Sequence, residues 1–114
     1  MTYYHGARNG EWAPHIGACL VDDERIAREY ARRGGTVYRV EVARLASVEV
    51  EVTQARRAEM DYPGDRDAER AALVNAGYDV AEYDDETENG RQHRCYRLLS
   101  DAAVAACVTV DADE

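Results

Sequence analysis

The sequence has no lysine and no phenylalanine, and its 114 residues include only two prolines and three cysteines. All 14 basic residues are therefore arginine. Cys19, Cys95 and Cys107 are odd in number and lack the paired spacing of a zinc site, which favours reduced thiols that pack in the core. We therefore expect neither a disulfide framework nor a metal site.

Long apolar runs are also missing. None approaches the roughly 20 residues that a membrane-spanning helix needs. The N-terminus carries neither the basic flank nor the apolar stretch of a signal peptide. These absences predict a cytoplasmic protein that does not enter a membrane. A chain of this length predicts a single domain over residues 1–114.

Positive charge is scarce, because 23 acidic residues face the 14 arginines and leave a formal net charge of −9. Proteins that bind DNA or RNA nonspecifically use cationic side chains to replace counterions on the phosphates. The acidic balance therefore argues against nonspecific binding to nucleic acid. An interaction with a basic patch on another protein stays open.

Hydrophobic periodicity predicts an α+β fold of short strands and about three short helices. The expected strands cover residues 2–5, 16–21, 36–42, 47–52, 78–83, 93–99 and 107–110. The expected helices cover residues 22–33, 67–77 and 100–107.

Capping residues fix the expected helix ends. Asp22 stands where the first helix would begin, and Gly34 follows its last basic residues. Gly77 should end the second helix, and Ser100 should cap the third. In the first helix an inward face is expected of Ile26, Ala27, Tyr30 and Ala31. In the second helix, the expected inward face consists of Ala68, Ala71, Ala72 and Leu73.

An ordered set of short motifs runs along these elements. The sequence YHG at residues 4–6 is followed by G-x-C-L-V-D at 17–22, a helix with A-x-x-Y-A, and the strand VYRVEV. GYD at 77–79, the acidic run from Asp84 and the strand CYRLL then follow. The set resembles the ADP-ribosyltransferase fold, in the branch with poly-ADP-ribose polymerases and small phage-encoded mono-ADP-ribosyltransferases. The resemblance covers residues 3–42 and 77–104, and implies a split antiparallel sheet that takes NAD as co-substrate.

The resemblance also implies where NAD would lie. His5 corresponds to the histidine that hydrogen-bonds a ribose hydroxyl, and the backbone of Gly6, followed by Ala7, to the segment that holds the nicotinamide carboxamide. Cys19 and Leu20 stand where relatives carry an aromatic ring against the nicotinamide. Tyr30 falls at the spacing of a second stacking tyrosine on the helix.

The resemblance further implies an acidic residue that grips the ribose and stabilises the cation formed as nicotinamide departs. Asp85 is the first candidate for this catalytic role and Glu86 the second, with His5 assisting. Many relatives hold their glutamate immediately before the strand CYRLL, where this sequence has Gln92, His93 and Arg94.

Each of these features also has a purely structural explanation. YHG fits a strand that enters a turn, Tyr30 fits a core position, and residues 84–88 fit a solvated hairpin loop. His15 and His93 are expected on the surface. Residues 61–69 lack the ligand spacing of a calcium loop and fit a turn followed by a helix cap.

Three functions therefore compete. The first is a mono-ADP-ribosyltransferase that modifies a protein acceptor, such as a host or defence protein if the chain is phage-encoded. The second is an inactive module of the same fold that binds NAD, ADP-ribose or a protein partner, which the cysteine at position 19 favours. The third is a transferase with a small-molecule acceptor, which ranks last because the GYD region does not match those enzymes.

Overall fold

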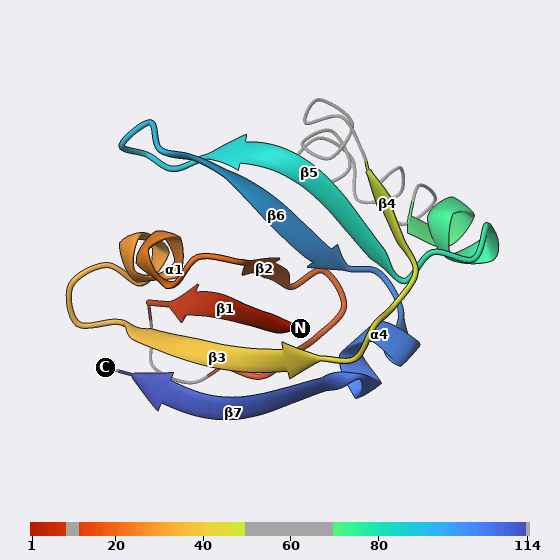
Figure 1. Cartoon of the computed structure of the whole chain (residues 1–114), viewed down its shortest axis with the longest axis horizontal. Helices are drawn as coiled ribbons and strands as arrows, with labels where there is room; N and C mark the ends of the chain where they lie inside the picture. The colour runs from red at the N-terminus through yellow and green to blue at the C-terminus, as the bar shows by residue number, and fades with distance from the viewer. Residues whose placement is uncertain (9–11, 50–69, 114) are drawn as a thin grey trace.

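One mixed sheet organises the chain. The computed structural model describes residues 1–8, 12–49 and 70–113. Its strands follow the order β4-β5-β6-β2-β1-β3-β7, and neighbours are antiparallel except for the parallel pair β4 and β5 (Figure 1). The strands are β1 (Thr2–Ala7), β2 (Cys19–Val21), β3 (Thr36–Val42), β4 (Ser47–Glu49), β5 (Val80–Glu86), β6 (Gln92–Leu98) and β7 (Cys107–Asp113). The α+β fold is as predicted.

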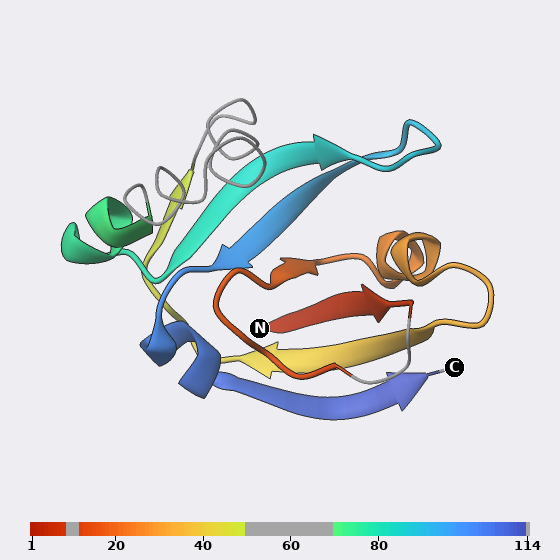
Figure 2. The ribbon, with the colours of Figure 1, turned by 180° about the vertical axis from the view of Figure 1, so that it is seen from behind.

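Short helices lie at opposite ends of this sheet. Helix α1 (Glu24–Ala31) lies where β6 diverges from β1, and α4 (Asp101–Ala105) joins β6 to β7 at the other end (Figures 1 and 2). Residues 70–75 are also helical. Ser100 caps α4 as predicted, because its hydroxyl accepts a hydrogen bond from the Ala103 N–H.

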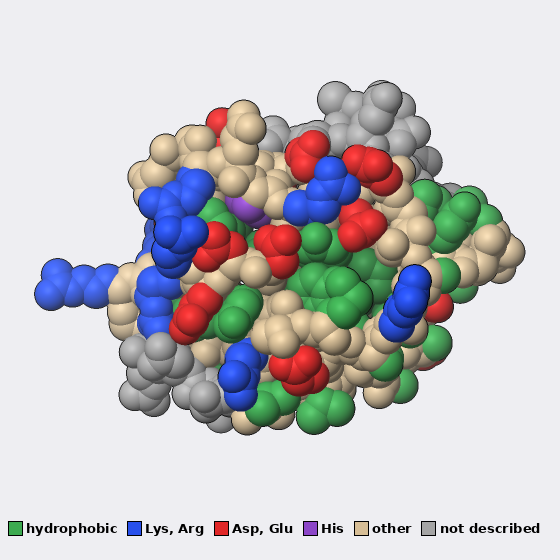
Figure 3. Space-filling model, viewed as in Figure 1, with side chains coloured by type: hydrophobic (Ala, Val, Ile, Leu, Met, Phe, Trp, Pro, Cys, Tyr) green, Lys and Arg blue, Asp and Glu red, His purple; other side chains and the backbone are tan. Residues whose placement is uncertain are grey.

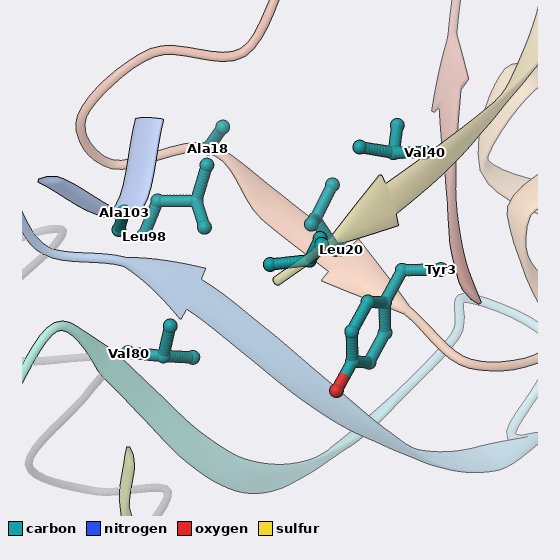
Figure 4. Close-up of a cluster of buried hydrophobic side chains, with 8 residues drawn as sticks. Tyr3, Ala18, Leu20, Val40, Val80, Leu98 and Ala103 are labelled. Carbon is teal, nitrogen blue, oxygen red and sulfur yellow. The ribbon is translucent and has the colours of Figure 1, made fainter. Parts of the chain in front are cut away.

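The sheet buries apolar side chains on both faces, since successive strand residues point to opposite sides. On one face Tyr3, Leu20, Val40 and Leu98 form the centre of a cluster that Ala103 of α4 completes (Figure 4). Leu20, Val40 and Leu98 are each 1% exposed or less. Complete burial of one such side chain contributes about 1.5–3 kcal/mol.

The other face packs against α1. Its cluster joins the predicted inward residues Ile26, Ala27 and Ala31 to strand residues that include Val37 and Cys95. Tyr30 lies half-buried beside the same cluster, so the predicted inward face of this helix is confirmed. The helix is therefore fixed against the strands that surround the candidate site.

Several element boundaries differ from the prediction. Strand β1 ends at Ala7 instead of residue 5, and β7 ends at Asp113 instead of residue 110. Helix α1 begins after Asp23, whose carboxylate accepts from the Arg25 N–H, and it ends before Arg32, which has a φ of 61°. Residues 16–18 are not strand, because a turn with a φ of +91° at Gly17 precedes β2. Strand β5 runs on to Glu86 instead of ending at residue 83.

The second predicted helix is present in part, with Gly77 at positive φ beyond its end. Its predicted inward face is wrong for Ala71 and Ala72, which are exposed, whereas Leu73 is half-buried. The buried face of this helix is therefore narrower than the spacing of its alanines indicates. The predictions for residues 50–52, 61–67 and Ala68 lie outside the described residues.

Charged side chains of both signs cover the surface. Figure 3 shows Arg side chains standing beside Asp and Glu side chains over one face of the molecule (Figure 3). Cross-strand ion pairs such as Arg94 with Asp84, 3.1 Å apart, contribute to this mixture. In the described part of the chain, no helix has the length and apolar character needed to cross a membrane.

Candidate functional site

A cavity of about 490 Å³ opens where β1, β2, β5, β6 and α1 meet. We call it the central cavity, and its lining consists of Tyr4, His5, Gly6, Ala7, Arg8, Trp12, Cys19, Val21, Tyr30, Tyr83, Asp85, Cys95 and Arg97. Its volume lies in the range of about 300–1,000 Å³ found for small-molecule sites. It is apolar and aromatic at several points, with a few polar groups that converge on it.

Strands β1 and β2 meet at the cavity with a short ladder. Their only residue pair in the described ladder joins Tyr4 to Val21, whereas β1 pairs with β3 along six positions. Beyond Tyr4 a side chain makes the contact, because Nδ1 of His5 lies 2.8 Å from the Cys19 carbonyl oxygen. Residues of both strands line the cavity.

His5 is fixed at the edge of this opening. Its Nδ1 lies 2.8 Å from the carbonyl oxygen of Cys19, and its ring stacks on Trp12 with centroids 4.2 Å apart and planes 14° apart. A carbonyl only accepts, so Nδ1 carries the proton and the ring in its neutral form keeps Nε2 as an acceptor. Burial lowers the pKa of His5, against an opposing contribution from this hydrogen bond. His5 is therefore a neutral acceptor near pH 7.

Gly6 has a structural reason to lack a side chain. A Cβ at this position would lie 2.0 Å from the Ala27 carbonyl oxygen and 2.7 Å from the Ala31 nitrogen. Both contacts are with the backbone of α1, which cannot yield as a flexible side chain would. Glycine thus allows α1 to pack directly on β1, and this close packing brings the helix up to the cavity.

Tyr30 of α1 faces β6 across the cavity wall. Its hydroxyl lies 2.6 Å from Nε2 of His93, and the two rings meet edge to face with centroids 5.4 Å apart. Burial raises the pKa of Tyr30, so the phenol stays protonated and shares this hydrogen bond with the imidazole. His93 was expected on the surface, but it is half-buried because Tyr30 covers it.

The hairpin between β5 and β6 also holds α1. The Asn89 side chain donates to Glu29 over 2.7 Å, Arg91 lies 3.7 Å from the same carboxylate, and Arg32 pairs with Glu88. Most of these groups are well exposed, and exposed ion pairs each contribute about 0–1 kcal/mol. Their importance is positional, because they set the distance between helix and hairpin.

Two thiols and a tyrosine also line the cavity. The Cys19 sulfur lies 3.9 Å from the Tyr83 hydroxyl, which accepts hydrogen bonds from Nη2 and Nε of Arg97 at 2.8 and 3.3 Å. The neighbouring Cys95 thiol, together with the charge of Arg97, lowers the pKa of Cys19 to about 7. The neighbouring Cys19 and burial both raise the pKa of Cys95.

Asp85 is the acidic residue of the cavity. Its Oδ2 lies 4.0 Å from the Cys95 sulfur, and its Oδ1 accepts a hydrogen bond of 2.8 Å from the Glu86 N–H. Asp85 lies within β5 because this strand continues past residue 83. On the neighbouring strand β6, His93 lies opposite Asp85. The expected hairpin loop is in this part a strand.

The structure thus gathers most of the predicted site residues. His5, Gly6, Ala7, Cys19, Tyr30 and Asp85 all line the central cavity. It does not bring Glu86 or Leu20 there. Glu86 is exposed and follows Asp85 on the strand, so it points to the opposite face, whereas Leu20 is buried in the cluster of Figure 4.

The cavity lining also includes residues that were not predicted for the site, among them Trp12, Tyr83, Cys95 and Arg97. For three of them a signal existed, because residues 83 and 85 on β5 and residues 95 and 97 on β6 share one face by strand alternation. Once Asp85 was a candidate, Tyr83 belonged to the same face. Trp12 lies outside regular structure, and no periodic pattern places it.

No three His, Cys, Asp or Glu side chains of the described ranges gather closely enough to hold a metal ion. Comparison of the chain with protein-family models, with curated proteins and with solved structures finds no match. The geometry of the central cavity is therefore the basis for assigning a function.

Proposed function

We propose that the chain is an NAD-dependent mono-ADP-ribosyltransferase that uses the central cavity as its active site and modifies a protein acceptor. One observation carries the proposal: His5, Gly6, Tyr30 and Asp85, which come from β1, α1 and β5, line one cavity of suitable size. These are the positions that the resemblance to ADP-ribosyltransferases assigns to NAD.

The state of His5 supports the binding of a ribose. A neutral imidazole with its proton on Nδ1 offers Nε2 as an acceptor for a hydroxyl donor. The hydrogen bond to the Cys19 carbonyl and the stack on Trp12 hold the ring in place before any ligand enters. Such preorganisation reduces the entropy that binding costs.

Tyr30 and Asp85 would supply the remaining contacts. The Tyr30 ring would form an apolar wall against the nicotinamide, while the hydrogen bond to His93 keeps that ring from turning. The Asp85 carboxylate would stabilise positive charge as the bond between nicotinamide and ribose breaks. Nicotinamide would leave as a neutral base, and the acceptor would add to the same ribose carbon and lose a proton to solvent.

The acceptor is proposed to be a protein in the cytoplasm, and a host or defence protein if the chain is phage-encoded. The same geometry also serves an inactive module that holds NAD or ADP-ribose without cleaving it. The thiol of Cys19 favours this second candidate, because it occupies a position where an aromatic ring would press on the nicotinamide.

Nicotinamide release from NAD, followed by proton NMR over hours, tests the proposal. The wild type should release nicotinamide, and Asp85→Asn should do so at least about 100-fold more slowly with its fold intact. Asp84→Asn is the matched control, since Asp84 is the exposed neighbour on the same strand and should retain full activity.

Broadening of the NAD signals without release would establish the binding module and reject the enzyme. A chain that neither cleaves NAD nor broadens its signals would reject both candidates.

A further inference from the structure

Two arginines share one carboxylate at the rim of the central cavity. Arg8 follows β1, and its Nη2 lies 3.6 Å from Oε1 of Glu88 on the β5–β6 hairpin. Arg32 follows α1, and its Nη2 contacts the same oxygen. Arg8 is part of the cavity lining, while at least half of each of the three side chains is exposed. We call Arg8, Arg32 and Glu88 the rim cluster, because it is open both to the cavity and to solvent.

Positive charge exceeds negative charge within the rim cluster. Two guanidinium groups meet a single carboxylate, although acidic residues outnumber arginines in the chain as a whole. Figure 3 shows Arg side chains gathered over the end of the molecule that carries α1 (Figure 3). Like charges held close together repel, and one carboxylate offsets only one of the two. A group with two negative charges would neutralise both arginines.

Arg8 also lies beside the residues proposed to hold the nicotinamide end of NAD. It comes three positions after His5 in the chain, and its Nε donates to the carbonyl oxygen of Tyr30 over 3.4 Å. A ribose bound at His5, with nicotinamide against Tyr30, would thus have Arg8 as a neighbouring cation. In a dinucleotide, a diphosphate is attached to that ribose. Guanidinium groups bind phosphate oxygens through charge-assisted hydrogen bonds.

We propose that Arg8 and Arg32 bind the diphosphate group of a dinucleotide, and that Glu88 occupies this anion site when no ligand is bound. Phosphate oxygens replace the Glu88 carboxylate on both arginines, and the glutamate side chain turns to solvent. No covalent bond changes in this exchange. The identity of the ligand as NAD rests on the proposed function, whereas the anion site rests on the two arginines and the carboxylate between them.

The sign of the effect at Glu88 separates this exchange from a purely structural role. If Glu88 competes with the ligand, removal of its charge frees both arginines and strengthens the binding of a diphosphate. If the ion pairs only hold the hairpin against α1, the same change loosens the cavity wall and does not strengthen binding. Arg8 should contribute to binding through its charge, because it lines the cavity.

Titrations with ADP and with adenosine, followed by proton NMR, test the site, because the two probes differ only in the diphosphate. The wild type should bind ADP more tightly than adenosine. Arg8→Gln should weaken ADP binding about 10-fold, the effect of one lost charge-assisted hydrogen bond, and leave adenosine binding unchanged. Glu88→Gln should strengthen ADP binding several-fold. Glu24→Gln is the matched control, since Glu24 is exposed at the opposite end of α1 and should leave ADP binding unchanged.

The outcomes separate the anion site from the proposed enzyme. ADP binding that depends on Arg8, in a protein that releases no nicotinamide, would support the site and reject the enzyme. Nicotinamide release by a protein that binds ADP no better than adenosine would overturn the site and leave the enzyme standing. A Glu88→Gln variant that binds ADP no more tightly than Glu24→Gln would overturn the exchange. All of these side chains are exposed, so the variants should fold like the wild type.

Discussion

The hydroxyl of Tyr30 on α1 shares a 2.6 Å hydrogen bond with Nε2 of His93 on β6, and so joins the helix to the strand beside the central cavity. We expect Tyr30→Phe to lower the free energy of unfolding by about 1–3 kcal/mol, because it leaves the half-buried His93 nitrogen without its hydrogen-bond partner. The measurement is urea unfolding of Tyr30→Phe, His93→Gln and the double variant. A coupling energy near zero in this cycle would show that the bond contributes no stability.

Protonation of His5 should make stability depend on pH. Burial lowers its pKa in the folded protein below the ordinary value of about 6.5, so the unfolded chain binds a proton more readily. Its contribution to stability is therefore complete above about pH 6.5 and is lost as the pH falls through the folded pKa. Urea unfolding at pH 7.5 and 5.5 should show a larger loss in the wild type than in His5→Asn. Identical losses would contradict this account, since the carboxylates titrate alike in both proteins.

The close contact between β1 and α1 makes Gly6 intolerant of any side chain. Gly6→Ala places a methyl group 2.0 Å from the Ala27 carbonyl oxygen, and the resulting shift of α1 should cost about 3 kcal/mol or more. Gly90→Ala is the control, because a Cβ there meets nothing within 4 Å and only its φ of +82° is strained, at about 1–2 kcal/mol. Thermal unfolding would compare the two. A variant at position 6 that is no less stable than the one at position 90 would refute the contact.

A substitution at Leu20 tests whether this residue contributes to the stability of the core or to NAD binding. The resemblance placed it beside NAD, whereas the structure leaves it 1% exposed in the cluster of Figure 4. We expect Leu20→Ala to lower the free energy of unfolding by about 2–5 kcal/mol and to leave the NAD affinity of the folded protein unchanged. Urea unfolding and an NMR titration with NAD measure the two effects. Weakened NAD binding in a fully folded variant would place Leu20 in the site after all.

Local pattern was sufficient for much of the fold. Residues 36–42 alternate and form β3 with the predicted bounds, and Ser100 caps α4 as its position indicates. Strand β5 shows where local pattern fails. An acidic run has low strand propensity, yet Asp84 and Asp85 extend the strand because Arg94 and His93 lie opposite them on β6. Cross-strand partners that are distant in sequence override the propensity of the residues themselves.

The candidate site could be predicted only in part, for a similar reason. Tyr30 stands on a helix whose inward face the sequence indicates, His5 was identified through the family resemblance, and both line the cavity. The contact of Arg97 with Tyr83 depends on the register between β5 and β6, which no local pattern fixes. Trp12 reaches His5 from a segment without periodicity.

The pairing of β3 with β7 also determines when this protein can fold. Residues 36–42 pair with residues 107–113, and β1 lies against the other side of β3. During synthesis, more than half of the chain must still be made after β3 before its partner strand β7 exists. Domains built on such distant pairings fold in about milliseconds to seconds, and helical bundles fold faster. Until β7 arrives, β3 presents an open strand edge, the kind of surface that chaperones protect in a nascent chain.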